Sequence, residues 1–220
     1  QPHQPDACRD PGGSPQTYPG ELTPHGETDC NHLMGFKGRE NVPLNEEGIR
    51  QAKACGHALS GCKIQAVYTS PLIRARRTGE IIAACSKLPE TSVFALPELI
   101  ERDMGIYSGK YMKSQAEFFA ISASPDSEGM EPFSQVLKRM KQALQIIARS
   151  GLGSAAAVSH GAAINVLLSD LSGGQAGTGK TKLYNGGITI LTGSLEEGFR
   201  IAACNLPPDS ALLQDIDLQK

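Results

Sequence analysis

The sequence has no tryptophan, few aromatic residues and no excess of charge of either sign. Aromatic residues make up 5% of its 220 residues and the net charge is -2, so no basic field is expected to attract nucleic acid or an anionic membrane. Its longest apolar runs, such as "AAINVLL", fall far short of the roughly 20 residues that span a membrane. Nucleic acid and membrane are therefore not expected partners, and the length favours one soluble domain.

Closely spaced cysteine pairs are also missing, because none of the six cysteines belongs to a C-x-x-C motif. A core of this size needs no disulfides, so free thiols in a reducing compartment, the cytoplasm, are expected. The chain begins at Gln1 and residues 1–20 lack the apolar segment of a secretion signal, but a form processed in an organelle is also compatible with this start. Metal binding by Cys55, His57 and Cys62 is an alternative, although these two cysteines lie two turns apart on a helix. No metal and no cofactor is expected.

Apolar periodicity predicts strands that alternate with helices along residues 21–205. Strands are predicted at 64–70, 91–96 and 154–159, with an antiparallel hairpin at 187–193 and 199–204. Helices are predicted at 45–60, 71–86, 131–150 and 160–171. This alternation indicates a three-layer α/β fold, in which a mostly parallel central sheet has helices on both faces. The Pro- and Gly-rich residues 1–20 are expected to form a flexible tail, and residues 206–220 a C-terminal tail.

Four polar residues follow strands of this predicted sheet: His25, Arg74, Glu101 and His160. Each alone has an ordinary explanation, such as a hydrogen-bonded histidine, a surface arginine or a solvated acid. Together they predict a site at the carboxyl edge of the sheet, where ligands of α/β folds bind. A neutral imidazole can attack phosphorus, while a guanidinium and a second, protonated imidazole bind the phosphoryl oxygens. A carboxyl group can protonate the leaving oxygen without any metal.

Five segments, in this order, resemble the motifs of the histidine phosphatase superfamily, whose fold is phosphoglycerate-mutase-like: "HGETDCN", "PLNEEGIRQA", "SPLIRARRT", "LIERDMGIYSG" and "VSHGAAINVLL". The resemblance covers residues 22–204. It implies that His25 is the nucleophile, that Arg74 and His160 bind the phosphoryl group, and that Glu101 is the general acid. It also implies binding roles near the phosphate for three further residues, Gly26, Thr28 and Asn31.

The segment before residue 42 departs from the family pattern. Pro24 stands where the family has an arginine, and losing one such donor from a site costs about 10²-fold to 10³-fold in rate. "PQTYPGELT" replaces an apolar strand and is expected to make a poor central strand. Gly35 and Asn41 replace an arginine and an aspartate. Lys37 replaces a glutamine, and an exposed lysine is favoured over an anion-binding one.

The function expected from these patterns is hydrolysis of a small phosphorylated metabolite through a phosphohistidine, with activity reduced by Pro24. An inactive protein that binds a phosphorylated ligand or acts as a scaffold is the alternative, and a phosphoglycerate-type mutase is less favoured. "GGQAGTGKT" (173–181) matches the P-loop of nucleotide hydrolases, but no strand precedes it, so a Gly-rich loop is expected. Five cations could contact a second anionic group of the substrate, although each is expected to be solvated: Lys37, Arg39, Arg102, Lys110 and Lys113. Nothing in the sequence indicates an oligomeric state.

Overall fold

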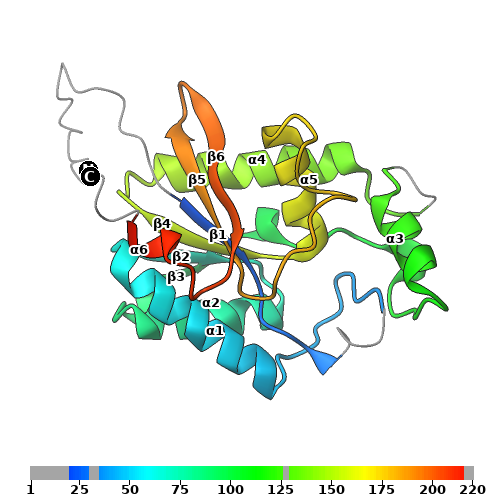
Figure 1. The fold of residues 1–220 in the computed structure, drawn as a ribbon, viewed down its shortest axis with the longest axis horizontal. Coiled ribbons are helices and arrows are strands. Elements are labelled where there is room, and N and C mark those ends of the chain that lie inside the picture. Colours follow the sequence, from blue (N-terminus) through cyan, green and yellow to red (C-terminus); the bar gives the residue numbers. More distant parts are fainter. Residues whose placement is uncertain (1–19, 30–34, 126–128, 216–220) are drawn as a thin grey trace, which may run out of the picture.

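A six-stranded sheet forms the centre of the computed structural model, which describes residues 20–29, 35–125 and 129–215 (Figure 1). Its strands lie in the order β3-β2-β4-β1-β5-β6. Their bounds are β1 Gly20–Pro24, β2 Ala66–Thr69, β3 Val93–Ala95, β4 Ala155–Ser159, β5 Ile188–Ser194 and β6 Gly198–Leu206. The first four pair in parallel, whereas β5 is antiparallel to β1 and β6 is antiparallel to β5. The predicted mostly parallel sheet and its closing hairpin are confirmed.

Helices cover both faces of this sheet, which confirms the three-layer α/β prediction (Figure 1). Helices α1 (Glu46–Leu59) and α2 (Ile73–Cys85) lie on one face, and α4 (Phe133–Arg149) and α5 (Gly161–Leu171) lie on the other. Two helices that the sequence did not predict are α3 (Gln115–Ala123) and α6 (Leu212–Asp215). Short 3-10 helices occupy Ser60–Cys62 (η2), Glu90–Ser92 (η3), Pro97–Leu99 (η4) and Gly105–Tyr107 (η5). No helix in the described ranges is long and apolar enough to cross a membrane.

Strand β4 is buried on both faces and therefore carries no polar alternation. Ala155 and Ala157 pack in the core beneath α4 and α5, whereas Ala156 and Val158 pack against α1 and α2. Their small side chains let both helical layers approach the sheet closely. His160 directly follows the end of this doubly packed strand.

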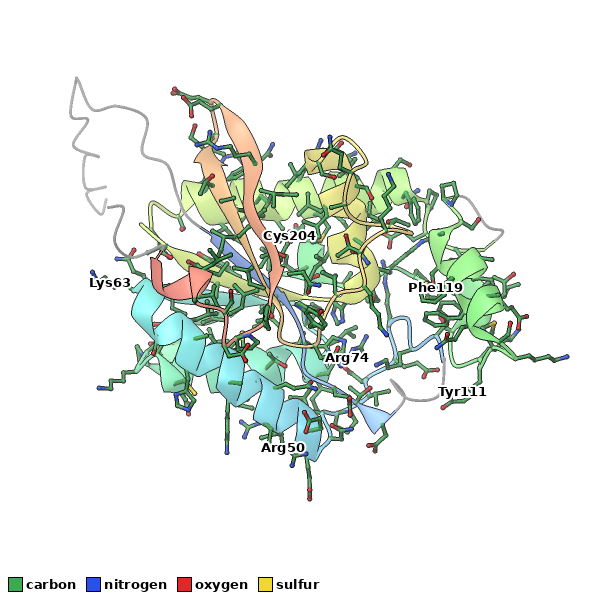
Figure 2. All side chains as sticks on the ribbon, in the orientation of Figure 1. Arg50, Lys63, Arg74, Tyr111, Phe119 and Cys204 are labelled. Atoms are coloured by element: carbon green, nitrogen blue, oxygen red, sulfur yellow. The ribbon has the colours of Figure 1, made fainter. Side chains whose placement is uncertain are left out.

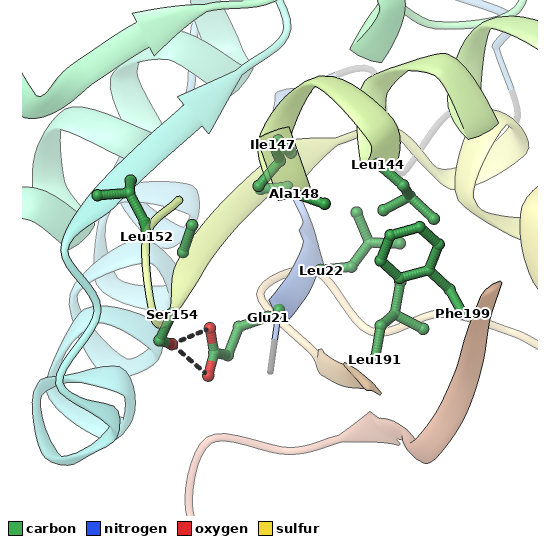
Figure 3. Close-up of a pocket in the computed structure, with 12 residues that line it drawn as sticks. Glu21, Leu22, Leu144, Ile147, Ala148, Leu152, Ser154, Leu191 and Phe199 are labelled. Atoms are coloured by element: carbon green, nitrogen blue, oxygen red, sulfur yellow. Dashed lines mark hydrogen bonds between the residues drawn. The ribbon is translucent and has the colours of Figure 1, made fainter. Parts of the chain in front are cut away.

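Strand β1 is a central strand, lying between β4 and β5, so the expectation of a poor central strand is wrong for residues 20–23. Residues 15–19 of that segment lie outside the described residues. Its Glu21 is only 2% exposed, and both carboxylate oxygens accept a hydrogen bond from Ser154 Oγ, at 3.1 and 3.3 Å (Figure 3). These bonds lie beside a small hollow of about 40 Å³, lined largely by apolar side chains. A buried carboxylate with hydrogen-bond donors is tolerated where an unpaired one is not.

Pro24 fits the last position of β1 because the sheet needs no donor there. The next residue, His25, donates its backbone N–H to Ser159 O of β4 at 3.1 Å. Since successive N–H groups of a strand point to opposite edges, the nitrogen of Pro24 faces β5. Strand β1 pairs with β5 only as far as Leu22, and the carbonyl of Pro24 accepts a bond from Gly186 N at 3.3 Å on that side. The proline therefore removes no ladder bond.

The predicted tail boundaries differ from the described structure at both ends. Gly20 already belongs to β1, and β6 extends to Leu206. Leu213, within the predicted C-terminal tail, is 5% exposed and packs in the core with α1 and α2. Residues 1–19 and 216–220 lie outside the described residues. Leu213 therefore attaches the segment after β6 to the hydrophobic core.

The loop after β1 packs against α1 through two glycines. A Cβ atom built on Gly48 would lie 2.1 Å from Glu27 O, and one built on Gly26 would lie 2.2 Å from Gly48 O. Because both obstacles are backbone atoms, neither can move aside cheaply. We expect Gly48→Ala to lower the free energy of unfolding by about 2–3 kcal/mol through overpacking, measured by urea denaturation. Gly61→Ala is the matched control, since no atom lies within 4 Å of its Cβ; equal losses in the two variants would contradict this packing.

Candidate active site

His25 lies directly after β1 and is 6% exposed. Its Nδ1 lies 2.6 Å from Gly26 O, and because a carbonyl only accepts, Nδ1 carries the proton. Nε2 is then unprotonated and accepts a hydrogen bond from Arg74 Nε at 3.1 Å. The imidazole is thus held in one tautomer, with a ring nitrogen lone pair directed towards a guanidinium.

Arg74 lies in the first turn of α2 and is 1% exposed. Its two terminal nitrogens donate to Glu40 O at 2.6 Å and Gly38 O at 2.9 Å. The guanidinium is therefore oriented by the loop at residues 38–40 as well as by His25. In Figure 2 it lies near the end of the sheet that faces α3, the helix that carries Phe119. Arg74 is therefore not the surface arginine that the sequence also allowed.

His160 follows β4 and is the N-cap residue of α5, fully buried beside His25. The two ring centroids are 5.1 Å apart in an edge-to-face arrangement. His160 Nε2 lies 2.6 Å from Ser70 Oγ. Its Nδ1 is buried and has no hydrogen-bond partner among the described residues. A buried polar atom of this kind is costly unless a ligand or water completes it.

Burial lowers the pKa of both histidines well below the usual 6.5. For His25 the charges of Arg74 and Lys37 lower the pKa further, against a bond to Gly26 that raises it. For His160 the added causes are His25, Arg74, Lys37 and Arg139. Both rings are consequently neutral near neutral pH. The surroundings of His160 therefore do not favour the protonated second imidazole that was expected, although a phosphoryl dianion beside the ring would raise its pKa.

These depressed pKa values predict that the protein loses stability in mild acid. Below the unfolded-state value of about 6.5, the unfolded chain binds protons that the folded protein does not. As the pH is lowered below about 6.5, the free energy of unfolding should therefore decrease by up to about 1.4 kcal/mol per pH unit for each histidine. Urea denaturation between pH 7.5 and 5 measures this slope, and His160→Gln should reduce it. A pH-independent free energy in this window would contradict the assignment.

Glu101 lies in the loop after η4, against the start of α5. Its Oε1 accepts hydrogen bonds from Arg102 N at 2.7 Å and Ala163 N at 3.1 Å, and Oε2 accepts a longer one from Ala162 N at 3.4 Å. The carboxyl group therefore lies at the N-terminus of the helix that His160 caps. The fourth predicted residue joins the other three, as the topology required.

A buried arginine network that was not predicted from the sequence holds the Glu101 loop. Arg102, expected to be solvated, is fully buried and donates to Glu131 O at 2.8 Å and Ser124 O at 2.8 Å. Arg139 binds the Glu131 carboxylate at 2.8 and 3.0 Å. Burial raises the pKa of Glu131, but the hydrogen bond and charge of Arg139 outweigh it and the pKa is lowered. The only indication of this network in the sequence was Arg139, a charged residue within the otherwise apolar face of the helix predicted at 131–150.

A cleft of about 680 Å³ opens beside these residues, and His25, Arg74 and Glu101 line it. Helix α3 contributes Phe118 and Phe119 to its wall. The Gly-rich loop contributes residues 178–183, so this false P-loop borders the cleft. The loop prediction is confirmed, because helix α5 precedes the segment and strand β5 is the next element after it.

The remaining predicted residues have mixed outcomes. Thr28 is fully buried, and its Oγ1 accepts a hydrogen bond from Lys37 Nζ at 2.7 Å. Gly26 donates to Thr78 Oγ1 at 3.1 Å and packs against α1. Asn31 lies outside the described residues. Lys37 is half-buried and lines the cleft, so the exposed lysine that was favoured is wrong.

Within the described ranges, no group of three or more His, Cys, Asp or Glu residues could hold a metal ion. Four cysteines in these ranges are free thiols, as expected: Cys55, Cys62, Cys85 and Cys204. Burial raises the pKa of the Cys55 thiol to about 12, so it stays protonated.

A family model of the histidine phosphatase superfamily (branch 1) matches residues 22–206. The chain belongs to this superfamily. Its similarity to "Uncharacterized phosphatase PhoE" of Bacillus subtilis is 31% identity over 186 residues, covering 84% of this chain and 93% of that protein. The histidine phosphatase resemblance proposed from five motifs is therefore confirmed, and with it an enzyme of this type.

Two further similarities bear on chemistry and fold. The "Metal-independent phosphoserine phosphatase" of Arabidopsis thaliana is 35% identical over 159 residues, which cover 66% of this chain and 65% of that protein. The crystal structure of a phosphoglycerate mutase from Bacillus anthracis superposes with a TM-score of 0.73 and 21% identity, covering 87% of this chain and 94% of that one. The fold of this histidine phosphatase superfamily member is thus phosphoglycerate-mutase-like.

Proposed function

We propose that this chain hydrolyses a small phosphorylated metabolite, without a metal, through a phosphohistidine at His25. The observation that carries the proposal is the orientation of the His25 ring. Its Nδ1 proton is tied to Gly26 O at 2.6 Å, which leaves the Nε2 lone pair beside the Arg74 guanidinium. A neutral nucleophile next to a fixed cation suits attack on an anionic phosphorus centre.

In the first step the Arg74 hydrogen bond to His25 Nε2 is released and the guanidinium binds the phosphoryl oxygens instead. The freed Nε2 lone pair attacks phosphorus and the ester P–O bond breaks. The leaving oxygen takes a proton from Glu101, for which Oε2 is the more available oxygen because its bond to Ala162 N is long, at 3.4 Å. The Nδ1 proton stays on the phosphorylated ring, and its bond to Gly26 O offsets the positive charge. Water then attacks phosphorus, gives a proton to the Glu101 carboxylate and releases His25 by cleavage of the P–N bond.

His160 is proposed to bind the phosphoryl group through Nδ1, the buried atom without a described partner. Ser70 Oγ already accepts a bond from Leu72 N at 3.3 Å, so its own proton is available to His160 Nε2. That arrangement puts the His160 proton on Nδ1, where it can donate to a phosphoryl oxygen. Pro24 contributes no donor, so activity is proposed to be lower than an arginine there would allow.

The proposal is tested with an aryl phosphate in the presence of EDTA, followed by a rapid quench in alkali. We expect turnover to persist in EDTA, and the quenched protein to carry an acid-labile phosphoryl group on the peptide that contains His25. Turnover that EDTA abolishes, or a phosphoryl group on another residue, would contradict the mechanism. Saturable binding of the ester with no turnover would favour a protein that only binds phosphorylated ligands.

A further inference from the structure

The proposed phosphoryl site must surround a dianion with positive charge. A phosphoryl dianion on His25 needs positive charge on more than one side, because developing charge in the transition state is spread over three oxygens. Arg74 supplies one cation at 3.1 Å from His25 Nε2. Pro24 lines the same cleft and supplies none. Among described cleft residues, the other cations are Lys37, Lys180 and Lys182.

Only one of these three lysines affects both histidines. Lys37 contributes to lowering the pKa of His25 and of His160, as Arg74 does. Lys180 Nζ instead donates to Gly174 O within its own loop, and Lys182 is exposed on the rim. Arg74 and Lys37 are therefore the two cleft cations that act on both imidazoles, and Arg139 acts in addition on His160.

The backbone at Lys37 is held from both neighbours. Phe36 is 6% exposed, stacks on Phe118 at 4.5 Å and donates its N–H to Lys110 O at 2.9 Å. On the other side, Gly38 O accepts the hydrogen bond from Arg74. The same guanidinium that contacts His25 therefore also fixes the residue next to Lys37.

The Lys37 side chain is fixed as well. Its ammonium donates to Thr28 Oγ1 at 2.7 Å, and Thr28 is fully buried three residues after His25. This hydrogen bond therefore holds the Lys37 ammonium close to the segment that carries His25. A half-buried, hydrogen-bonded lysine in a cleft is preorganised for an anion in a way that a solvated lysine is not.

We propose that Lys37 is a catalytic residue that contacts the phosphoryl oxygens and supplies the positive charge that position 24 lacks. This inference rests on the proposed function, because it assigns a second cation to the same phosphoryl group. The expected behaviour is a mutual dependence between positions 24 and 37. Removal of the Lys37 charge should lower kcat/KM strongly while residue 24 is proline. The same removal should have little effect once an arginine is placed at residue 24.

The test is a double-mutant cycle on an aryl phosphate. Lys37→Met should lower kcat/KM by about 10²-fold, and Lys37→Arg should stay within about 10-fold of wild type. In a Pro24→Arg background, Lys37→Met should cost less than about 10-fold, because the new guanidinium takes over the contact. Lys53→Met is the matched control, since Lys53 is an exposed lysine of α1 outside the cleft lining.

A binding measurement separates a contact from a structural role. Lys37→Met should weaken inhibition by orthovanadate or inorganic phosphate about as much as it lowers kcat/KM, with an unchanged urea unfolding midpoint. Unchanged turnover in Lys37→Met, or an equal loss in the Pro24→Arg background, would overturn the role of Lys37 while leaving the phosphohistidine mechanism intact. Failure of the proposed function appears differently, as no phosphoryl group on His25 in the wild-type protein.

Discussion

Replacement of His25 by alanine is expected to lower kcat/KM for an aryl phosphate by at least about 10⁴-fold, because it removes the nucleophile itself. The measurement is steady-state hydrolysis together with the alkaline quench. Both turnover and the phosphorylated protein should disappear.

Two comparisons make the His25 result decisive. His57→Ala removes an exposed histidine of α1 and should retain wild-type turnover. The urea unfolding midpoint of His25→Ala must also remain in the range of a folded protein, since the ring is buried and bonded to Arg74. A folded His25→Ala variant that hydrolyses the ester as fast as wild type would refute the covalent mechanism.

Replacement of Pro24 by arginine is expected to raise kcat/KM by about 10-fold to 10²-fold, because it adds a guanidinium to the wall of the phosphoryl pocket. The gain is smaller than the usual loss of a donor, since Lys37 already contributes charge there. The backbone can accept the change. Pro24 occupies the last position of β1, and its nitrogen faces the side on which pairing with β5 has ended.

Pro24→Met is the matched control, because methionine, like arginine, has a backbone N–H and a long unbranched side chain but carries no charge. Only the arginine variant should gain activity. If both variants gain equally, the proline limits activity through the backbone rather than through the missing charge. Inactive wild type with an active Pro24→Arg would indicate an intact pocket that the proline disables. If wild type, Pro24→Arg and His25→Ala are all inactive, the binding or scaffold alternative is favoured.

Much of this site followed from the order of elements along the chain. His25, Arg74, Glu101 and His160 each come after a strand, and parallel strands bring their carboxyl ends to one edge of the sheet. Short apolar runs and helical periodicity are local signals, so β2, β4, α1 and α4 were predicted near their observed positions. The family motifs agreed with this arrangement at each of the four residues.

Other features were misjudged because they depend on residues distant in sequence. Glu21 made β1 unlike a central strand, but Ser154 supplies the donor that its buried carboxylate needs. Arg102 had the composition of a surface residue, yet it finds carbonyl acceptors on segments about 20 to 30 residues away. Helix α3 has almost no one-sided apolar pattern, so periodicity did not reveal it.

By itself, the sequence determined the α/β layering and the four polar residues at one sheet edge, because both follow from local periodicity and strand order. The tertiary structure alone decided the state of those residues. Burial and neighbouring cations make both histidines neutral, and the loop that binds Arg74 also carries Lys37. Whether Pro24 disturbs the sheet was likewise decided by where pairing with β5 ends. Charge and hydrogen bonding depend on which groups meet across the fold, and that is a property of packing rather than of any one segment.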